Sequence, residues 1–191
     1  KEIGYLNEVM DRKALSTLIS TALMKLGNET VVLLLDQIKS TSFHYLTTSG
    51  ISWGMSDLIT PPEKQGILKE ADKQSEEIYS HYQQGLLTDE ERHIKVIEIW
   101  AQAKDKIQKV SRESLDRFGP IFSMIESGAR GSWAQTTQMM GMKGLVTNPA
   151  GDTIELPVKG SFKEGFDVLE YFISTHGARK GLSDTALRTA N

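Results

Sequence analysis

EKQGILKEADKQSEEIYSHYQQGLLTDEERHIKVIEIWAQAKDKI, residues 63–107, is the stretch that decides the predicted fold. Its first half carries a thin apolar stripe, which is typical of a coiled-coil seam rather than of a globular face. Gly85 breaks this helix, and Thr88 with Glu91 forms a capping-box pattern that starts a return helix. Two helices joined by so short a turn are expected to lie antiparallel. The expected seam residues are Ile67, Ala71, Gln74, Ile78 and Tyr82 on the first helix, and Ile94, Ile97, Trp100, Ala101, Lys104 and Ile107 on the second.

The turn of this hairpin, residues 84–92, is expected to project into solvent. It would expose Leu86 and Leu87 beside Asp89 and Glu90. An apolar pair on an acidic promontory suits a docking point for a protein partner, and a plain solvated turn is the alternative. Composition alone favours the solvated turn, because scattered surface leucines are common.

Residues 1–60 predict a pair of helices. An apolar face that follows Asp11 ends at Gly27, a residue type favoured just past a helix end, and Asn28 can cap a second helix that runs towards Gly50. This second helix begins with the run VVLLL, residues 31–35, which is apolar all round and is therefore expected to be buried. The stretch SGISWGMSDLITPP that follows is rich in glycine and proline and predicts an irregular linker.

The stretch FGPIFSMIESGARGSWAQTTQMMGMKGL, residues 118–145, gathers glycines and methionines around Arg130 and Lys143. Its Gly-Ala-Arg-Gly-Ser loop can direct backbone N–H groups at an anion, with Arg130 adding a fork of donors that suits phosphate. An ordinary tight turn is the commoner outcome of such a sequence, and such methionines are more often core filling than a binding groove. A short β-hairpin follows, with Val146 and Thr147 in one strand, residues 153–156 in the other, and Pro157 ending the ladder.

The last stretch, SFKEGFDVLEYFISTHGARKGLSDTALRTAN, predicts a helix that begins with a capping box made by Ser161 and Glu164. Two glycines within it, Gly177 and Gly181, each cost about 1 kcal/mol relative to alanine in a helix interior. Close approach of another backbone or of a nucleic acid would explain them, and so would a helix that bends. The helix reaches Asn191 without a capping residue and the chain starts without methionine. The sequence is therefore expected to be a segment of a longer protein.

Composition narrows the class of protein. The 191 residues are 39% hydrophobic and 25% charged, which fits a soluble globular chain. The net charge of -3 argues against a generally basic nucleic-acid coat, and the lack of cysteine excludes disulfides and cysteine-ligated zinc. We expect no membrane partner, because no apolar run approaches the roughly 20 residues of a membrane span and the amino end lacks a signal-peptide core.

Residue chemistry alone predicts a fold but no reaction. The sequence has no P-loop, HExxH helix or nucleophile elbow, and its four histidines show no metal-ligand spacing. The predicted fold is mainly α, a helical domain with a projecting antiparallel coiled-coil hairpin and one short β-hairpin. It has four parts, residues 1–60, 61–117, 118–160 and 161–191.

The motif FISTHGARKGLSDTALRTAN resembles the start of the bridge helix in the largest catalytic subunit of multisubunit RNA polymerases, β′ in bacteria. Further similar motifs occur in the order that the family has them: LLDQIKSTSFHYLTTSGISWGMSDL, GLLTDEERHIKVIEIW, IESGARGS, GMKGL and LPVKGSFKEG. STHGARKGL favours the bacterial form, and a split plastid subunit is the second choice. The resemblance implies a part of DNA-directed RNA polymerase, a nucleotidyltransferase of transcription, in the cytoplasm at the bacterial nucleoid.

This resemblance implies a role for each part. The four parts become the funnel region, the secondary-channel coiled coil, a Gly/Met-rich segment with a β-hairpin, and the first half of the bridge helix. Arg130 matches the family arginine that faces the incoming triphosphate, so the anion interpretation now outweighs the tight turn. Arg179 and Lys180 match basic positions near the nucleic acid and the active centre, and Thr189 and Ala190 match positions against the template base.

Two further roles follow from the resemblance. Gly177 and Gly181 fit a helix that flexes during translocation. The hairpin becomes the rim of the channel through which nucleoside triphosphates enter, where Gre-type transcript-cleavage factors and other channel-binding factors dock. The docking residues are expected to be Leu86, Leu87, Asp89, Glu90 and Arg92.

The implied partners are the β, α, ω and sigma subunits, with DNA template, RNA and nucleoside triphosphates in the intact enzyme. The family's magnesium motif NADFDGD and its zinc sites fall outside this sequence, so we expect no cofactor within it and no activity from it alone. Thr137 stands where many relatives carry a basic residue, which weakens a wider phosphate site, and residues 111–125 are too few to predict their path. A stand-alone helical-hairpin interaction module is the alternative class, which a gene without NADFDGD upstream would favour.

Overall fold

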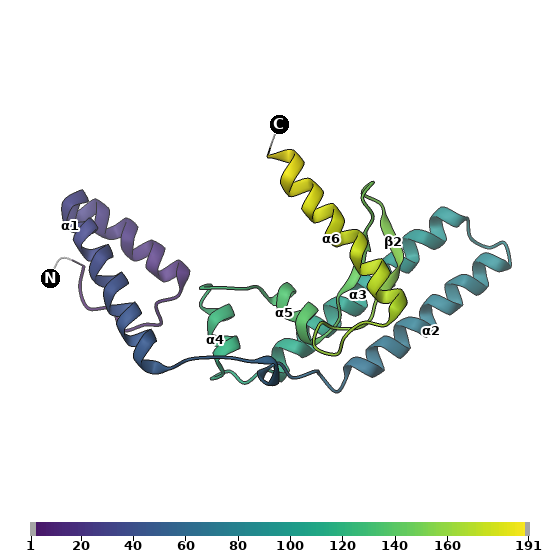
Figure 1. Cartoon of the computed structure of the whole chain (residues 1–191), viewed down its shortest axis with the longest axis horizontal. Helices are drawn as coiled ribbons and strands as arrows, with labels where there is room; N and C mark the ends of the chain where they lie inside the picture. The colour runs from purple at the N-terminus through teal and green to yellow at the C-terminus, as the bar shows by residue number, and fades with distance from the viewer. Residues whose placement is uncertain (1–2, 190–191) are drawn as a thin grey trace. The chain divides into compact units, whose positions relative to one another are not determined.

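The computed structural model describes residues 3–189 and is mainly α-helical, as the sequence predicts (Figure 1). Within these residues there are six α-helices, one short 3₁₀ helix and one antiparallel pair of strands. The helices are α1 (Arg12–Ser49), α2 (Lys64–Gln83), α3 (Asp89–Ser114), α4 (Pro120–Glu126), α5 (Trp133–Met140) and α6 (Val168–Arg188), the 3₁₀ helix is Met55–Asp57, and the strands are β1 (Gly144–Thr147) and β2 (Thr153–Val158).

The chain divides into two compact units. The first contains the residues up to Asp57 together with Asp116–Ser132, and thus α1 and α4. The second contains Leu58–Leu115 together with the residues from Trp133 onward, and thus α2, α3, α5, both strands and α6. The four parts named from the sequence are functional segments and stay a prediction.

Helix α1 of the first unit is two helices joined at a break, as predicted. Gly27 has φ 76° and ψ 168°, which only glycine adopts readily, and Gly50 ends the second helix in the left-handed region. The expected burial of the run 31–35 is wrong for this chain. Val31 is buried, but Leu33 is 65% exposed, because the first unit covers only one side of the run.

By length and composition alone, α1 could also cross a membrane. The sequence analysis did not identify this stretch. The core helix of a soluble protein and a signal sequence meet the same criterion.

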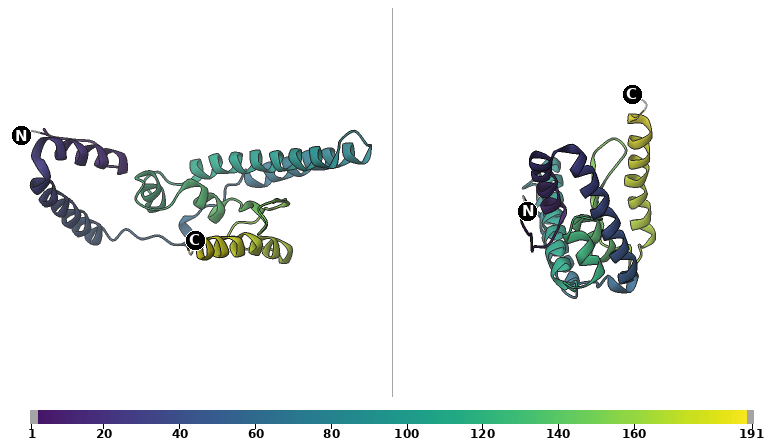
Figure 2. Two further views of the ribbon diagram at one scale, coloured as in Figure 1. Left: turned by 90° about the horizontal axis from the view of Figure 1, so that it is seen from above. Right: turned by 90° about the vertical axis from the view of Figure 1, so that its left-hand side faces the viewer.

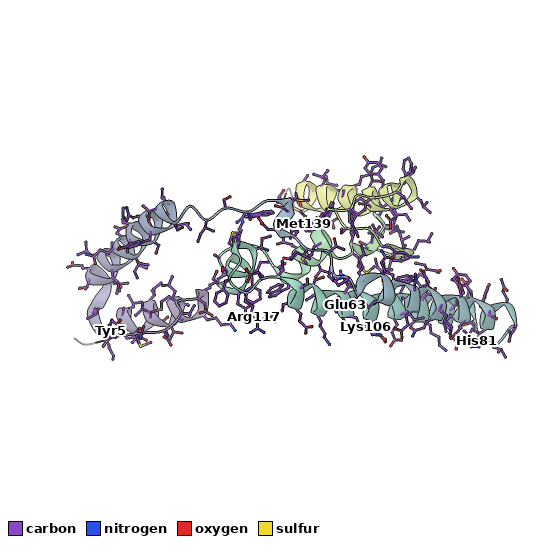
Figure 3. All side chains as sticks on the ribbon, turned by 90° about the horizontal axis from the view of Figure 1, so that it is seen from below. Tyr5, Glu63, His81, Lys106, Arg117 and Met139 are labelled. Atoms are coloured by element: carbon purple, nitrogen blue, oxygen red, sulfur yellow. The ribbon has the colours of Figure 1, made fainter. Side chains whose placement is uncertain are left out.

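Helices α2 and α3 of the second unit form the predicted antiparallel hairpin (Figure 1). In Figure 3 the labelled side chains of Glu63 and Lys106 lie near its base, and His81 lies towards its tip. Both predicted end signals are present. Gly85 (φ 74°) ends α2 with hydrogen bonds from Leu86 N to His81 O (3.0 Å) and from Gly85 N to Tyr82 O (2.9 Å), a Schellman pattern.

The buried stripe of α3 differs from the predicted one. Ile94 is 58% exposed and Ala101 is exposed, so both predictions are wrong. The hydrophobic residues of α3 in the core are Val96, Trp100, Ala103 and Ile107.

On α2, the expected seam residue Gln74 is exposed and bonds to Glu70, while Leu68 is buried. The buried residues of the hairpin differ from the predicted ones because α3 packs against two partners. It meets α2 on one side, and Met142 and Leu145 from the region of β1 join the same core on another.

The β-hairpin is present, but its ladder continues past Pro157. Gly144 pairs with Val158, and the register shifts between Gly144 and Val146. A bulge tolerates a residue that has no N–H to donate, which explains why proline does not end the strand.

Helix α6 begins at Val168 and not at Ser161, so the predicted start is wrong. The capping box of Ser161 and Glu164 exists, but it closes only a turn, because Gly165 (φ 88°) leaves the helical conformation. A second capping box, made by Asp167 and Glu170, then starts the helix. The first box has another use, since Glu164 forms an ion pair with Lys64, which is 2% exposed at the start of α2.

The β-hairpin lies between the coiled-coil hairpin and α6 (Figure 2, left). Both strands contact α3, and both contact α6. A small cluster of Val146, Val158 and Ile173 forms the core between the strands and α6. The second unit is therefore a layered body in which the strands join two sets of helices.

Candidate factor-docking tip and terminal helix

The tip of the hairpin exposes the side chains that the sequence assigned to docking. Leu86 is 66% exposed and Leu87 half-buried, and Asp89 and Glu90 are exposed. The capping box of Thr88 starts α3, with Glu91 N donating to Thr88 Oγ1 (3.2 Å) and Thr88 N donating to Glu91 Oε2 (2.9 Å). The hydrogen bonds that Thr88 N and Thr88 Oγ1 donate to Glu91 Oε2 lower the pKa of Glu91. The first turn of α3 is thus both acidic and held in place.

Arg92 does not share this exposure. It is only 8% exposed, which contradicts the expectation that it projects with the tip. Its guanidinium donates to Asp89 Oδ1 from Nη2 (2.8 Å) and to both carboxylate oxygens of Glu155 on β2, with Nη2 to Oε1 at 2.9 Å. It also lies over the rings of Tyr79 and Tyr82, with its central carbon 4.9 and 5.4 Å from the ring centroids. Arg92 is therefore an internal connection of the second unit.

Glu155 is the residue that sequence reasoning missed. It accepts from Arg92, from Tyr79 Oη (3.3 Å), and shares a 2.6 Å contact with His93 Nδ1. The hydrogen bonds from Arg92 lower the pKa of Glu155 to about 2 against the opposing effect of burial, and His93 adds to the lowering. The same contacts raise the pKa of Arg92. Burial and the charge of Glu155 raise the pKa of Tyr79. We call Arg92, Asp89 and Glu155 the arginine clamp.

A cleft of about 530 Å³ lies beside the clamp, between the hairpin and β2. Its charged walls are paired, since Lys159 Nζ lies 2.6 Å from Asp72 Oδ1 and 5.3 Å from the centroid of the Trp100 ring. The clamp and this pair therefore fasten the hairpin to β2 at two levels.

The residues expected near nucleic acid lie on one continuous helix. Arg179 is exposed, and Lys180 is half-buried with Nζ 3.5 Å from Asp184 Oδ2. Thr189 Oγ1 donates to Thr185 O at 3.0 Å. Ala190 lies outside the described residues. Arg179 is therefore open to an anion from solvent, whereas Lys180 is already paired with Asp184.

The two glycines of α6 are not equivalent. A Cβ atom added at Gly177 would lie 2.7 Å from Val146 Cγ1, whereas one added at Gly181 would meet nothing within 4 Å. Gly177 thus permits β1 to approach the helix, which is one of the explanations that the sequence left open. Between Val168 and Arg188 the helix has no break, and the hinge role of both glycines stays a prediction.

The start of α6 is anchored by backbone and side-chain contacts. Glu170 Oε1 accepts from the backbone N–H groups of Lys159 (2.7 Å) and Gly160 (2.9 Å). Lys143, whose pKa burial lowers, donates to Ser174 and lies over the rings of Phe162 and Phe166. These contacts hold the first half of α6 on the β-hairpin.

Arg130 belongs to the first unit, and α6 belongs to the second. It is exposed in a turn where Gly128 and Gly131 have φ 72° and 83° and where Arg130 N donates to Met124 O at 3.3 Å. Thr137, in the second unit, is 1% exposed and donates to Trp133 O (2.8 Å), so its hydroxyl is engaged inside the protein.

Among the described residues, 3–189, no group of three or more His, Cys, Asp or Glu side chains could hold a metal ion. The exposed cations Arg130 and Arg179 have the chemistry to bind and orient an anion.

Comparison with known proteins places this geometry in a family. Residues 70–163 match the family model for RNA polymerase Rpb1, domain 4, and residues 165–191 match that for RNA polymerase Rpb1, domain 5. The first match covers the coiled-coil hairpin from residue 70 onward and the β-hairpin, and the second covers α6.

Individual relatives match along nearly the whole chain. The DNA-directed RNA polymerase subunit β′ of Pelotomaculum thermopropionicum is 48% identical over 191 residues, 100% of this chain and 16% of the relative. The β′ subunit of Geobacillus kaustophilus is 50% identical over 180 residues, 94% of this chain and 15% of the relative. The β′ subunit of Clostridium botulinum is 46% identical over 190 residues.

These sequence matches place the chain in the Rpb1 class of polymerase subunits. The chain belongs to the bacterial RNA polymerase β′ family, as the sequence motifs predicted. It spans about one sixth of the length of the relatives that it matches, 16% in the first.

Proposed function

We propose that this chain is the part of a bacterial DNA-directed RNA polymerase that forms the rim of the secondary channel and the start of the bridge helix. The observation that carries the proposal is 48% identity to a β′ subunit over all 191 residues of this chain. In this role it works in transcription, in the cytoplasm, together with the other polymerase subunits. The reaction is template-directed nucleotidyl transfer, in which residues outside this chain supply the metal chemistry.

The hairpin tip would receive protein factors that enter the channel. Three properties support this: Leu86 is 66% exposed, Asp89 is 73% exposed in its side chain, and capping fixes the turn that carries them. An apolar residue beside fixed carboxylates suits a partner with a basic rim around an apolar patch. Transcript-cleavage factors are the partner class that we propose.

Charge reversal tests the tip. Asp89→Lys combined with Glu90→Lys should weaken the binding of a cleavage factor. Factor-free elongation should stay unchanged, because both side chains are exposed. Glu98→Lys, an exposed change on the same helix further from the tip, is the matched control. A factor response equal to that of the unmodified enzyme would sink the docking proposal.

Arg130 would orient the triphosphate of the incoming nucleotide. Its exposure in a turn with two left-handed glycines supports this, since such a turn leaves the guanidinium fork open to a phosphate. Arg130→Ala in the assembled enzyme should raise the KM for nucleotides and leave promoter binding intact. Arg130→Lys, which keeps the charge and loses the fork, separates charge from geometry. Unchanged nucleotide kinetics in both variants would remove the assigned role.

Helix α6 would lie beside the template, with Arg179, Lys180, Thr189 and Ala190 facing nucleic acid or the active centre. Its anchored first half and exposed second half, where Leu182 and Leu187 are 75% and 66% exposed, support a helix fixed at one end. An Arg179→Ala enzyme should form an elongation complex that is less stable than the parent at low salt and less sensitive to added salt, because a phosphate contact contributes most where salt does not screen it. Equal salt resistance of variant and parent would argue against that contact.

A further inference from the structure

Glu155 joins three elements through one carboxylate. It lies on β2, and its oxygens meet Arg92 and His93 at the start of α3 and Tyr79 on α2. A carboxylate that accepts a forked pair of bonds from arginine fixes both distance and orientation, because the two planar groups must align. The contact is therefore specific in geometry as well as attractive.

Arg92 connects Glu155 to the hairpin tip. Its Nε and Nη2 donate to Asp89 Oδ1 at 3.1 and 2.8 Å, three residues earlier in the first turn of α3. Asp89 is itself 73% exposed in its side chain and is part of the proposed docking surface. A side chain on β2 thus holds, through one arginine, a carboxylate that a partner would meet.

Strand β2 faces α6 as well as the hairpin. Successive side chains of a strand point to opposite faces, and Ile154, next to Glu155, packs on the cluster that contains Ile173 of α6. Lys159 repeats the pattern, since its side chain pairs with Asp72 of α2 while its backbone N–H donates to Glu170 of α6. The hairpin tip and α6 are therefore both held by contacts to the same strand, β2, and its end.

We infer that Glu155 is a positioning residue that fixes the first turn of α3, and with it the docking surface around Asp89, relative to the strand that carries α6. The inference rests on the proposed docking of factors at the tip. A factor that binds the tip and acts near α6 then depends on Glu155 without needing to touch it, because the carboxylate is engaged with Arg92.

The test uses assembled polymerase that carries Glu155→Gln, which keeps the shape of the side chain and removes its charge. Glu98→Gln is the matched control, since Glu98 is exposed on α3 and accepts a hydrogen bond from Gln102, four residues further along the same helix. Amide hydrogen exchange of Glu91 and Arg92, whose N–H groups donate to Thr88 in the first turn of α3, gives the first measurement. The concentration of transcript-cleavage factor needed for half-maximal RNA cleavage gives the second.

Exchange in the first turn of α3 should rise by on the order of tenfold in Glu155→Gln, because a charged hydrogen-bond pair is lost. The half-maximal factor concentration should rise in the same variant, Glu155→Asp should recover part of both effects, and Glu98→Gln should change neither. Unchanged exchange in Glu155→Gln would overturn the inference, and so would increased exchange with an unchanged factor response. Glu90→Lys, an exposed change at the tip outside the arginine clamp, distinguishes the two proposals. If it too leaves the factor response unchanged, docking at the tip itself fails, whereas an effect of Glu90→Lys alone rejects only the role of Glu155.

Discussion

Substituting Gly177 and Gly181 separately with alanine tests why α6 contains glycine. Alanine in a helix interior is favoured over glycine by about 1 kcal/mol, so Gly181→Ala, with nothing within 4 Å of the new methyl group, should stabilise the chain by about that amount. At Gly177 the same gain is opposed by a clash, because the new methyl group would lie 2.7 Å from Cγ1 of Val146. Carbon atoms pack best at about 3.5–4.0 Å, and overpacking of this kind costs about 1–3 kcal/mol. Gly177→Ala should therefore lie between neutral and about 2 kcal/mol destabilising.

A third substitution, Val146→Ala, removes the methyl group with which the new side chain would clash. In that background Gly177→Ala should regain its helical benefit, giving a coupling free energy of about 1–3 kcal/mol between the two sites. Urea unfolding followed by circular dichroism at 222 nm gives the free energies. Equal effects of Gly177→Ala and Gly181→Ala, or no coupling of Gly177→Ala to Val146→Ala, would refute the packing explanation.

Three further predictions concern stability. Ile107→Ala should destabilise the chain by about 2–5 kcal/mol, because Ile107 is 1% exposed in the core between α2, α3 and the β1 region; urea unfolding measures it. Thr88→Ala should cost about 1 kcal/mol through loss of the N-cap, and Thr88→Ser should restore most of it in the same assay. The pKa of Glu155 is about 2, below its usual 4.5, so the stability contributed by the clamp should be present above pH 4.5 and be lost as the pH falls from 4.5 towards 2. Acid titration of Glu155→Gln should lack that part of the loss, and identical acid profiles would contradict it.

Elements with local signals were predictable from the sequence. The ends of the hairpin helices depend on Gly85 and on the bonds between Thr88 and Glu91, all within a few residues, and the structure has them. The break at Gly27 was predictable for the same reason. Local backbone hydrogen bonding decides these positions, so no distant contact is needed to find them.

Features that depend on distant partners were missed. The start of α6 was assigned to the capping box of Ser161 and Glu164, whereas the structure starts the helix at a second box, Asp167 with Glu170, because Gly165 leaves the helical conformation. The buried stripe of α3 was assigned from one partner, whereas Met142 and the β-hairpin form a second. Glu155 gave no signal at all, because a single acid in a short strand reads as a solvent-facing residue until Arg92 is placed beside it.

The family resemblance carried the candidate site further than composition could. It marked Arg130 and the cations of α6, whose residue types alone would suit many surfaces. It also marked Arg92 as part of the exposed docking surface, and there the structure corrects it, since Arg92 is 8% exposed and bound to Glu155. Sequence similarity locates a functional region, but only the contacts separate the side chains that face a partner from those that hold the surface in place.

The central proposal is that this chain performs the part of β′ that it resembles. The most direct measurement replaces the matching segment of the Geobacillus kaustophilus β′ subunit, which is 50% identical over 180 residues, with this chain. The hybrid subunit is assembled with its β, α and ω partners, and extension of RNA is followed on a nucleic-acid scaffold with each of the four nucleotides withheld in turn. The account predicts extension that stops where the template requires the missing nucleotide, and cleavage of backtracked RNA on addition of the cleavage factor. A hybrid that assembles with the other subunits but extends no RNA would contradict it.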